Sequence, residues 1–201
     1  MPQSDSSDPD LGNSCPTGIK GLDSLIGGGL PQHRFYLVQG DPGVGKTTFG
    51  LQFLLEGARR GEKSLYITLS ETREELLEVA TSHNWDLSTL DIFELSAIEA
   101  TLSAESQNTL FHPSEVELTQ ISEILMDEVA RVQPARVVFD SLSELRLLAQ
   151  NPLRYRRQLL SLKQFFAGRK CTVLVRACDI TAARNCALPC LGRVMRLSGG
   201  P

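Results

Sequence analysis

The sequence LVQGDPGVGKTTFG, residues 37–50, decides the fold. An apolar run that predicts a buried strand leads into a glycine-rich turn, and a lysine and two threonines follow it. The spacing of Gly40, Gly45, Lys46 and Thr47 matches the pattern GxxxxGK followed by Ser or Thr. Glycines let successive backbone N–H groups turn toward phosphate oxygens, where a Cβ would obstruct them, and the following helix adds its positive N-terminal end. The stretch therefore predicts a loop that binds the phosphates of a nucleotide.

Two side chains of this loop have expected roles. Lys46 can reach the β- and γ-phosphates, and the Thr47 hydroxyl can ligate Mg²⁺. The chain contains no Asn-Lys-x-Asp string of the kind that reads guanine, so we expect ATP and not GTP. The residues predicted to bind ATP are Gly40, Asp41, Pro42, Gly43, Val44, Gly45, Lys46, Thr47 and Thr48.

An acidic residue at the end of a second strand completes the expected site. Asp140 ends the run RVVFD, residues 136–140, in the manner of a Walker B acid that holds the Mg²⁺ shell together with Thr47. Two further strand-like runs, at residues 64–69 and 91–96, lie between the loop and Asp140. This insertion favours the P-loop proteins that place a catalytic glutamate on an extra strand, and disfavours small nucleotide kinases and GTPases.

The rest of the chain alternates strands with helices. Helices are predicted at 47–60, after a capping box of Thr72 and Glu75, after a second box of Ser114 and Glu117, and at 152–167; a fifth strand is predicted at 171–175. A polar connection without periodicity covers residues 97–113. Strands that alternate with helices predict an α/β fold, a parallel sheet sandwiched by helices.

Composition limits the kind of protein. With 201 residues and 41% hydrophobic side chains, the chain can form one sizeable core, and it contains neither an apolar run of membrane-spanning length nor a signal pattern. We therefore expect a cytoplasmic protein with no membrane partner. The formal net charge of −4 argues against nucleic acid as a partner, and the five cysteines lack metal-binding spacing, so reduced thiols are expected.

Four strings together resemble the KaiC-like ATPase domain of the RecA superfamily. They are CPTGIKGLDSLIGGGLP (15–31), GDPGVGKTT (40–48), LYITLSETREEL (65–76) and VVFDSLSELR (137–146). The first is the most discriminating, because generic P-loop proteins lack it. The resemblance covers about residues 15–175 and implies a RecA-like core, ATP binding and hydrolysis, and hexameric rings with nucleotide between subunits. Some relatives phosphorylate their own serines or threonines in a second domain copy, which this sequence does not contain.

The catalytic base is the open point of this resemblance. In circadian KaiC proteins the second strand ends in a Glu-Glu pair, and a glutamate there activates the attacking water, whereas this chain has Ser70 and Glu71. Serine cannot act as a carboxylate base, so hydrolysis is expected to be slow and to use Glu71 if the strand has ended and turned by Ser70. The candidate catalytic residues are Glu71, Ser70 and Lys46. The expected function is an ATPase, and three alternatives stay open: an ATP-dependent interaction module for a signalling partner, a recombinase-like DNA-dependent ATPase, and a serine/threonine autokinase.

Both ends of the sequence differ from the expected domain. Residues 1–14 predict a disordered leader, and residues 15–175 the ATP-binding domain. Residues 176–201 carry four arginines, one acidic residue and three of the five cysteines, which suggests a truncated or frame-shifted end and an incomplete core. The alternative is a divergent loop with a short strand around RVMRL, residues 193–197. The basic run at 154–170 predicts a solvated helix face, or a face that docks on an acidic neighbouring subunit.

Overall fold

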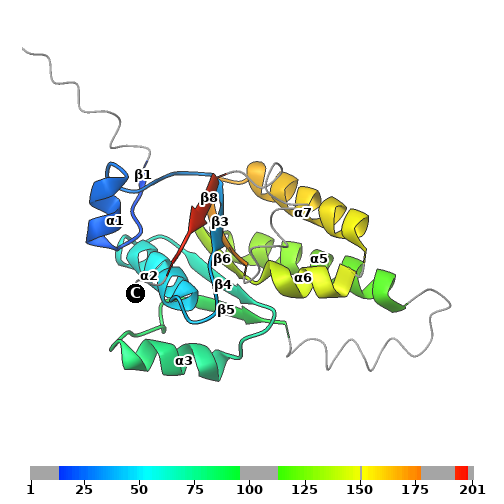
Figure 1. Ribbon diagram of the computed structural model, residues 1–201, viewed down its shortest axis with the longest axis horizontal. Coiled ribbons are helices and arrows are strands. Elements are labelled where there is room, and N and C mark those ends of the chain that lie inside the picture. Colours follow the sequence, from blue (N-terminus) through cyan, green and yellow to red (C-terminus); the bar gives the residue numbers. More distant parts are fainter. Residues whose placement is uncertain (1–13, 96–112, 150, 178–192, 199–201) are drawn as a thin grey trace, which may run out of the picture.

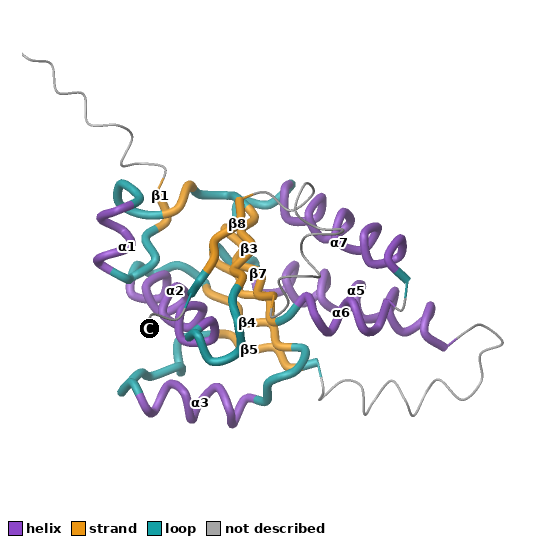
Figure 2. The backbone as a smooth tube through the Cα atoms, in the orientation of Figure 1, coloured by secondary structure: helices purple, strands orange, loops and turns teal. Residues whose placement is uncertain are grey.

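The computed structural model describes residues 14–95, 113–149, 151–177 and 193–198. Within them, six parallel strands form one sheet in the order β5-β4-β6-β7-β3-β8, with helices on both faces (Figures 1 and 2). The strands are β3 (Phe35–Gln39), β4 (Ser64–Thr68), β5 (Asp91–Glu94), β6 (Arg136–Asp140), β7 (Thr172–Ala177) and β8 (Arg193–Arg196). The prediction of an α/β fold with a helix-sandwiched parallel sheet is confirmed.

Two sets of helices cover the sheet. The helices α1 (Lys20–Leu25), α2 (Lys46–Arg59) and α3 (Arg73–Ser82) lie on one side, and α5 (Pro113–Val132), α6 (Leu142–Ala149) and α7 (Pro152–Ala167) lie on the other (Figure 1). A small antiparallel pair, β1 (Ser14–Cys15) with β2 (Leu30–Pro31), lies beside α1. Because side chains alternate along a strand, β3 sends Leu37 toward the α5–α7 core and Tyr36 toward the α2–α3 core.

The helix boundaries follow local signals. Thr72 and Glu75 form the predicted capping box at the start of α3. The Asn151 side chain accepts a hydrogen bond from the Leu153 N–H and caps α7, with Pro152 in the first turn. Helix α5 begins at Pro113, so Ser114, the predicted cap, lies within its first turn. Helix α6 was not predicted, although its buried Leu142, Leu145 and Ala149 have helical spacing.

The predicted atypical tail contributes to the sheet. Strand β7 continues through Arg176 and Ala177, two residues past the predicted end of the domain. Strand β8 pairs in parallel with β3, so that Leu37 lies opposite Val194, and this agrees with the alternative of a short strand around residues 193–197. The suggestion that 176–201 is a truncated or frame-shifted end stays a prediction. Of the predicted leader at 1–14, residues 1–13 lie outside the described residues, and Ser14 belongs to strand β1. Most of the 97–113 connection also lies outside the described residues.

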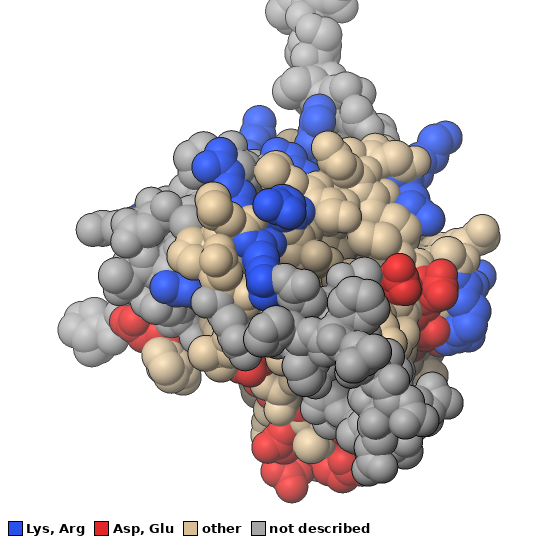
Figure 3. Space-filling view, turned by 90° about the vertical axis from the view of Figure 1, so that its right-hand side faces the viewer, with Lys and Arg blue, Asp and Glu red and all other residues tan. Residues whose placement is uncertain are grey.

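The basic run at 154–170 forms an amphipathic helix. Tyr155, Leu159, Leu162 and Phe166 are buried against the sheet, while Arg156 and Arg157 are exposed. Lys and Arg side chains gather in the upper part of this side of the molecule (Figure 3). These arginines are therefore exposed in the single chain, and the two predicted roles of the face, solvated or docked on a neighbouring subunit, both stay predictions. None of the helices in the described part of the chain is long and apolar enough to cross a bilayer.

Candidate nucleotide-binding site

The glycine-rich turn connects β3 to α2 as predicted. Gly43 and Gly45 have φ angles of +83° and +86°, which L side chains rarely adopt. A Cβ at either position would meet no atom within 4 Å, so both glycines border open space. A side chain at these positions would protrude into that space. The backbone of the turn therefore borders a space that the neighbouring described residues leave open.

Gly40, the first glycine of the loop, has a different reason to lack a side chain. A Cβ there would lie 2.6 Å from the Leu197 carbonyl oxygen and 2.8 Å from Val44 Cγ2. Leu197 follows β8, and its N–H donates a 2.7 Å hydrogen bond to the Gln39 carbonyl. The segment after β8 therefore packs directly against the start of the loop.

Lys46 lies inside the turn and is only 3% exposed. Its Nζ donates hydrogen bonds to the carbonyl oxygens of Gly40, at 2.9 Å, and Asp41, at 2.6 Å. The ammonium charge is thereby held within the loop, at the N-terminus of α2. This is the position from which a lysine can neutralise phosphate oxygens.

Asp140 lies at the carboxyl end of β6, opposite Thr68 of the neighbouring strand β4. It is 1% exposed, and Tyr66 donates a 2.8 Å hydrogen bond to its Oδ2. Burial raises the pKa of Asp140 to about 6; the Arg176 guanidinium opposes this rise, and the charge of Glu71 adds to it. The peptide bond from Asp140 to Ser141 is cis.

Glu71, and not Ser70, reaches the site. Strand β4 ends at Thr68, whose hydroxyl accepts a hydrogen bond from the Glu71 N–H and donates one to the Glu71 carbonyl. The turn brings the Glu71 carboxylate to the P-loop, where its Oε1 accepts a 3.1 Å hydrogen bond from the Thr47 hydroxyl. Ser70 is exposed. The strand has thus ended and turned before Ser70, which is the condition under which Glu71 was expected to act.

Arg176, at the carboxyl end of β7, is the site residue that the sequence analysis missed. Its Nη1 contacts Asp140 Oδ2 in a salt bridge and donates a 2.9 Å hydrogen bond to the Tyr66 hydroxyl. The same nitrogen lies 3.4 Å from both carboxylate oxygens of Glu71. The signal was present in the sequence, because a lone arginine in an apolar strand is costly unless it is paired. It was assigned to the tail instead.

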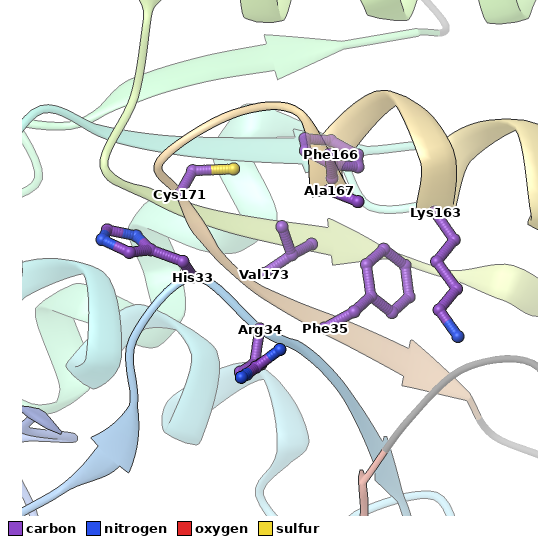
Figure 4. A pocket seen from close by; sticks show the side chains of 8 residues that line it. All are labelled: His33, Arg34, Phe35, Lys163, Phe166, Ala167, Cys171 and Val173. Atoms are coloured by element: carbon purple, nitrogen blue, oxygen red, sulfur yellow. The ribbon is translucent and has the colours of Figure 1, made fainter. Parts of the chain in front are cut away.

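A separate cavity of about 110 Å³ lies at the other end of β3 and β7. Phe35, Phe166 and Val173 line it, together with Cys171, whose pKa burial raises to about 11 (Figure 4). Phe35 begins β3, whereas the glycine loop follows its last residue, so the length of the strand separates this cavity from Lys46. The cavity is therefore not part of the nucleotide-binding site.

The fold and the site define a class of protein. A glycine turn between a strand and a helix, with an interior lysine, a threonine and an acid at the end of a nearby strand, is the arrangement of the P-loop NTPases. The chain belongs to the KaiC ATPase family, whose model matches residues 15–184.

Relatives and solved structures agree with this membership. A UPF0273 protein of Pyrococcus horikoshii is 30% identical over 162 residues, covering 78% of this chain and 64% of the relative. The circadian clock protein KaiC2 of Synechocystis is 43% identical over 77 residues, which cover 38% of this chain and 14% of that protein. The crystal structure of a KaiC-like protein from Pyrococcus horikoshii superimposes with a TM-score of 0.63 and 26% identity, covering 82% of this chain and 69% of the other. This chain therefore spans just under two thirds of the length of the Pyrococcus UPF0273 protein.

Proposed function

We propose that this protein binds ATP with Mg²⁺ and hydrolyses it slowly to ADP and phosphate. The observation that supports this most is the convergence of Lys46, Thr47, Glu71 and Asp140 at the carboxyl edge of the sheet. These side chains come from α2, from the turn after β4 and from β6, so only the fold brings them together. A glycine turn with a purely structural role would not require a lysine, a threonine and two acidic side chains beside it.

The residues fit the phosphates of a nucleotide. The open space beside Gly43 and Gly45 admits a group that a Cβ would obstruct, and the buried ammonium of Lys46 supplies a positive charge. The Thr47 hydroxyl and the Asp140 carboxylate are the oxygen donors that Mg²⁺ prefers, and they would hold it. Bound there, Mg²⁺ would offset the charge of the phosphates.

Glu71 is the candidate general base. Hydrolysis joins a water oxygen to the γ-phosphorus, breaks the bond to the β–γ bridging oxygen, and requires that the water lose a proton. The Glu71 carboxylate lies beside Thr47, and the Glu71 side chain is 29% exposed, so water can reach it. Ser70 is exposed and is not expected to take part.

A second candidate is an ATP-dependent interaction module with negligible hydrolysis. The observation that favours it is the pairing of Arg176 with both Asp140 and Glu71, since a guanidinium on these carboxylates opposes metal binding and proton uptake. In that case bound ATP would order a surface for a signalling protein. We also propose self-association, as a ring with nucleotide between subunits, on the resemblance to KaiC-like proteins, and a cytoplasmic location.

Phosphate release from Mg-ATP by purified protein separates the two candidates. For the ATPase we expect turnover that Lys46→Ala abolishes and that Glu71→Gln lowers about 10²-fold while nucleotide binding persists. Ser70→Ala is the matched control and should keep the rate of the unaltered protein. Turnover no faster than that of Lys46→Ala would favour the interaction module, and a rise in Ser70→Glu with no effect of Glu71→Gln would move the base to position 70.

A further inference from the structure

Arg176 is bound more tightly into the site than a surface arginine. The residue is 6% exposed, and its contacts come from two neighbouring strands and the turn after one of them: Tyr66 on β4, Glu71 after β4, and Asp140 on β6. Its Nε is buried and has no hydrogen-bond partner in the structure. An arginine with one unsatisfied buried nitrogen persists only if its remaining contacts compensate for the lost hydration.

The arginine is also the cation that balances these two acids. Lys46, the other buried positive side chain of the site, directs its Nζ to the carbonyls of Gly40 and Asp41. The guanidinium, by contrast, contacts Asp140 Oδ2 and both oxygens of Glu71. Without it, no positive side chain of the described residues would contact these two carboxylates.

We infer that Arg176 is a built-in competitor of the divalent cation, so that a metal ion gains full use of Asp140 and Glu71 only when the guanidinium moves away. The inference rests on the proposed function, because it assigns a control of the metal step at that same site. A fixed positive charge on the carboxylate repels a second cation at short range, and the repulsion is strong where water is largely excluded.

The competition predicts a specific change in metal affinity. When Arg176 is replaced by glutamine, the acids lose their cation and become an anionic oxygen site. One elementary charge removed from a partly buried site should raise the affinity for a divalent cation by at least about tenfold. Lysine retains the charge but places it on a shorter, more flexible side chain without the planar set of guanidinium donors, so Arg176→Lys should hold the carboxylates less firmly and give an intermediate affinity.

The test is a titration of the full-length, nucleotide-free protein with Mn²⁺ as the probe, read by the electron paramagnetic resonance of free Mn²⁺. The unaltered protein should bind Mn²⁺ weakly, Arg176→Lys more tightly and Arg176→Gln most tightly, with one ion per chain. The double variant Arg176→Gln with Asp140→Asn should lose the gain. Arg156→Gln, which removes an exposed charge from α7, is the matched control and should behave as the unaltered protein.

Two results would overturn the inference. One is equal Mn²⁺ affinity in the unaltered protein and in folded Arg176→Gln; the other is a gain that survives Asp140→Asn. If Arg176→Gln does not fold, Arg176→Lys decides, and the absence of any gain in that variant counts against competition. The measurement needs no nucleotide, so failure to bind ATP would refute the proposed function alone.

Discussion

Replacement of Gly40 by alanine tests the contact between the glycine loop and the end of the chain. The new Cβ would lie 2.6 Å from the Leu197 carbonyl oxygen and 2.8 Å from Val44 Cγ2. The valine can adjust, but the carbonyl belongs to a backbone that the Leu197 N–H ties to Gln39 by a 2.7 Å hydrogen bond. Either the segment after β8 or the start of the loop must therefore move.

Overpacking of this kind costs about 1–3 kcal/mol of unfolding free energy. For a chain of this size, each kcal/mol corresponds to about 2–4 °C in Tm. Urea denaturation followed by circular dichroism measures the cost, and a chain that ends at residue 192 provides the second background. Because the Leu197 contact is absent there, Gly40→Ala should cost at least about 1 kcal/mol less in the shortened chain.

Gly43→Ala is the control for this comparison of the full and the shortened chain. It has no clash, but it places alanine at a φ of +83°, which costs about 1 kcal/mol in both backgrounds. Equal costs of Gly40→Ala in the full and shortened chains would refute the packing of Leu197 against the loop. If the shortened chain lowers the cost of Gly40→Ala but not that of Gly43→Ala, the segment after β8 supports the start of the glycine loop.

Four further substitutions have definite expectations. Asp140→Asn should keep ATP binding but lose its Mg²⁺ dependence and hydrolysis, and unchanged hydrolysis in a phosphate-release assay would remove Asp140 from the site. Gly57→Ala places a Cβ 2.5 Å from Arg136 Cδ and should lower stability by about 1–3 kcal/mol, whereas Gly21→Ala, with nothing within 4 Å, should raise it by up to about 1 kcal/mol in thermal denaturation. Arg136→Ala should cost about 3 kcal/mol or more in the same assay, since this fully buried guanidinium pairs with an acid and two backbone carbonyls.

Much of the fold could be predicted because its signals are local. The five strands predicted from apolar, β-rich runs all occur, and each lies within one or two residues of the predicted bounds. The turn between Gly40 and Gly45 follows from the glycine spacing, and α3 starts at its capping box. Helix α6 could not be predicted in the same way, because its eight residues span only about two turns and so carry little helical periodicity.

The sequence could not predict whether Ser70 or Glu71 faces the site, because the answer depends on the exact residue at which strand β4 ends. A strand that continued through Ser70 would reverse the faces of the two side chains. The structure ends β4 at Thr68, whose hydroxyl makes two hydrogen bonds to the Glu71 backbone. A threonine that bonds three residues ahead is a turn signal, but the sequence alone does not distinguish it from a threonine inside a strand.

The arginine at the end of β7 shows why a change in composition is a poor guide to a domain boundary. The arginine-rich, acid-poor character that set residues 176–201 apart begins with Arg176, the residue whose guanidinium holds Asp140 and Glu71 together. At the other end of that segment, Leu197 packs against Gly40. The segment that its charge sets apart from the rest of the chain thus contributes Arg176 to the acidic side chains and Leu197 to the glycine loop. Because a buried carboxylate beside a second acid requires a positive charge, the arginine that departs from the apolar pattern of the strand is the residue that the site needs.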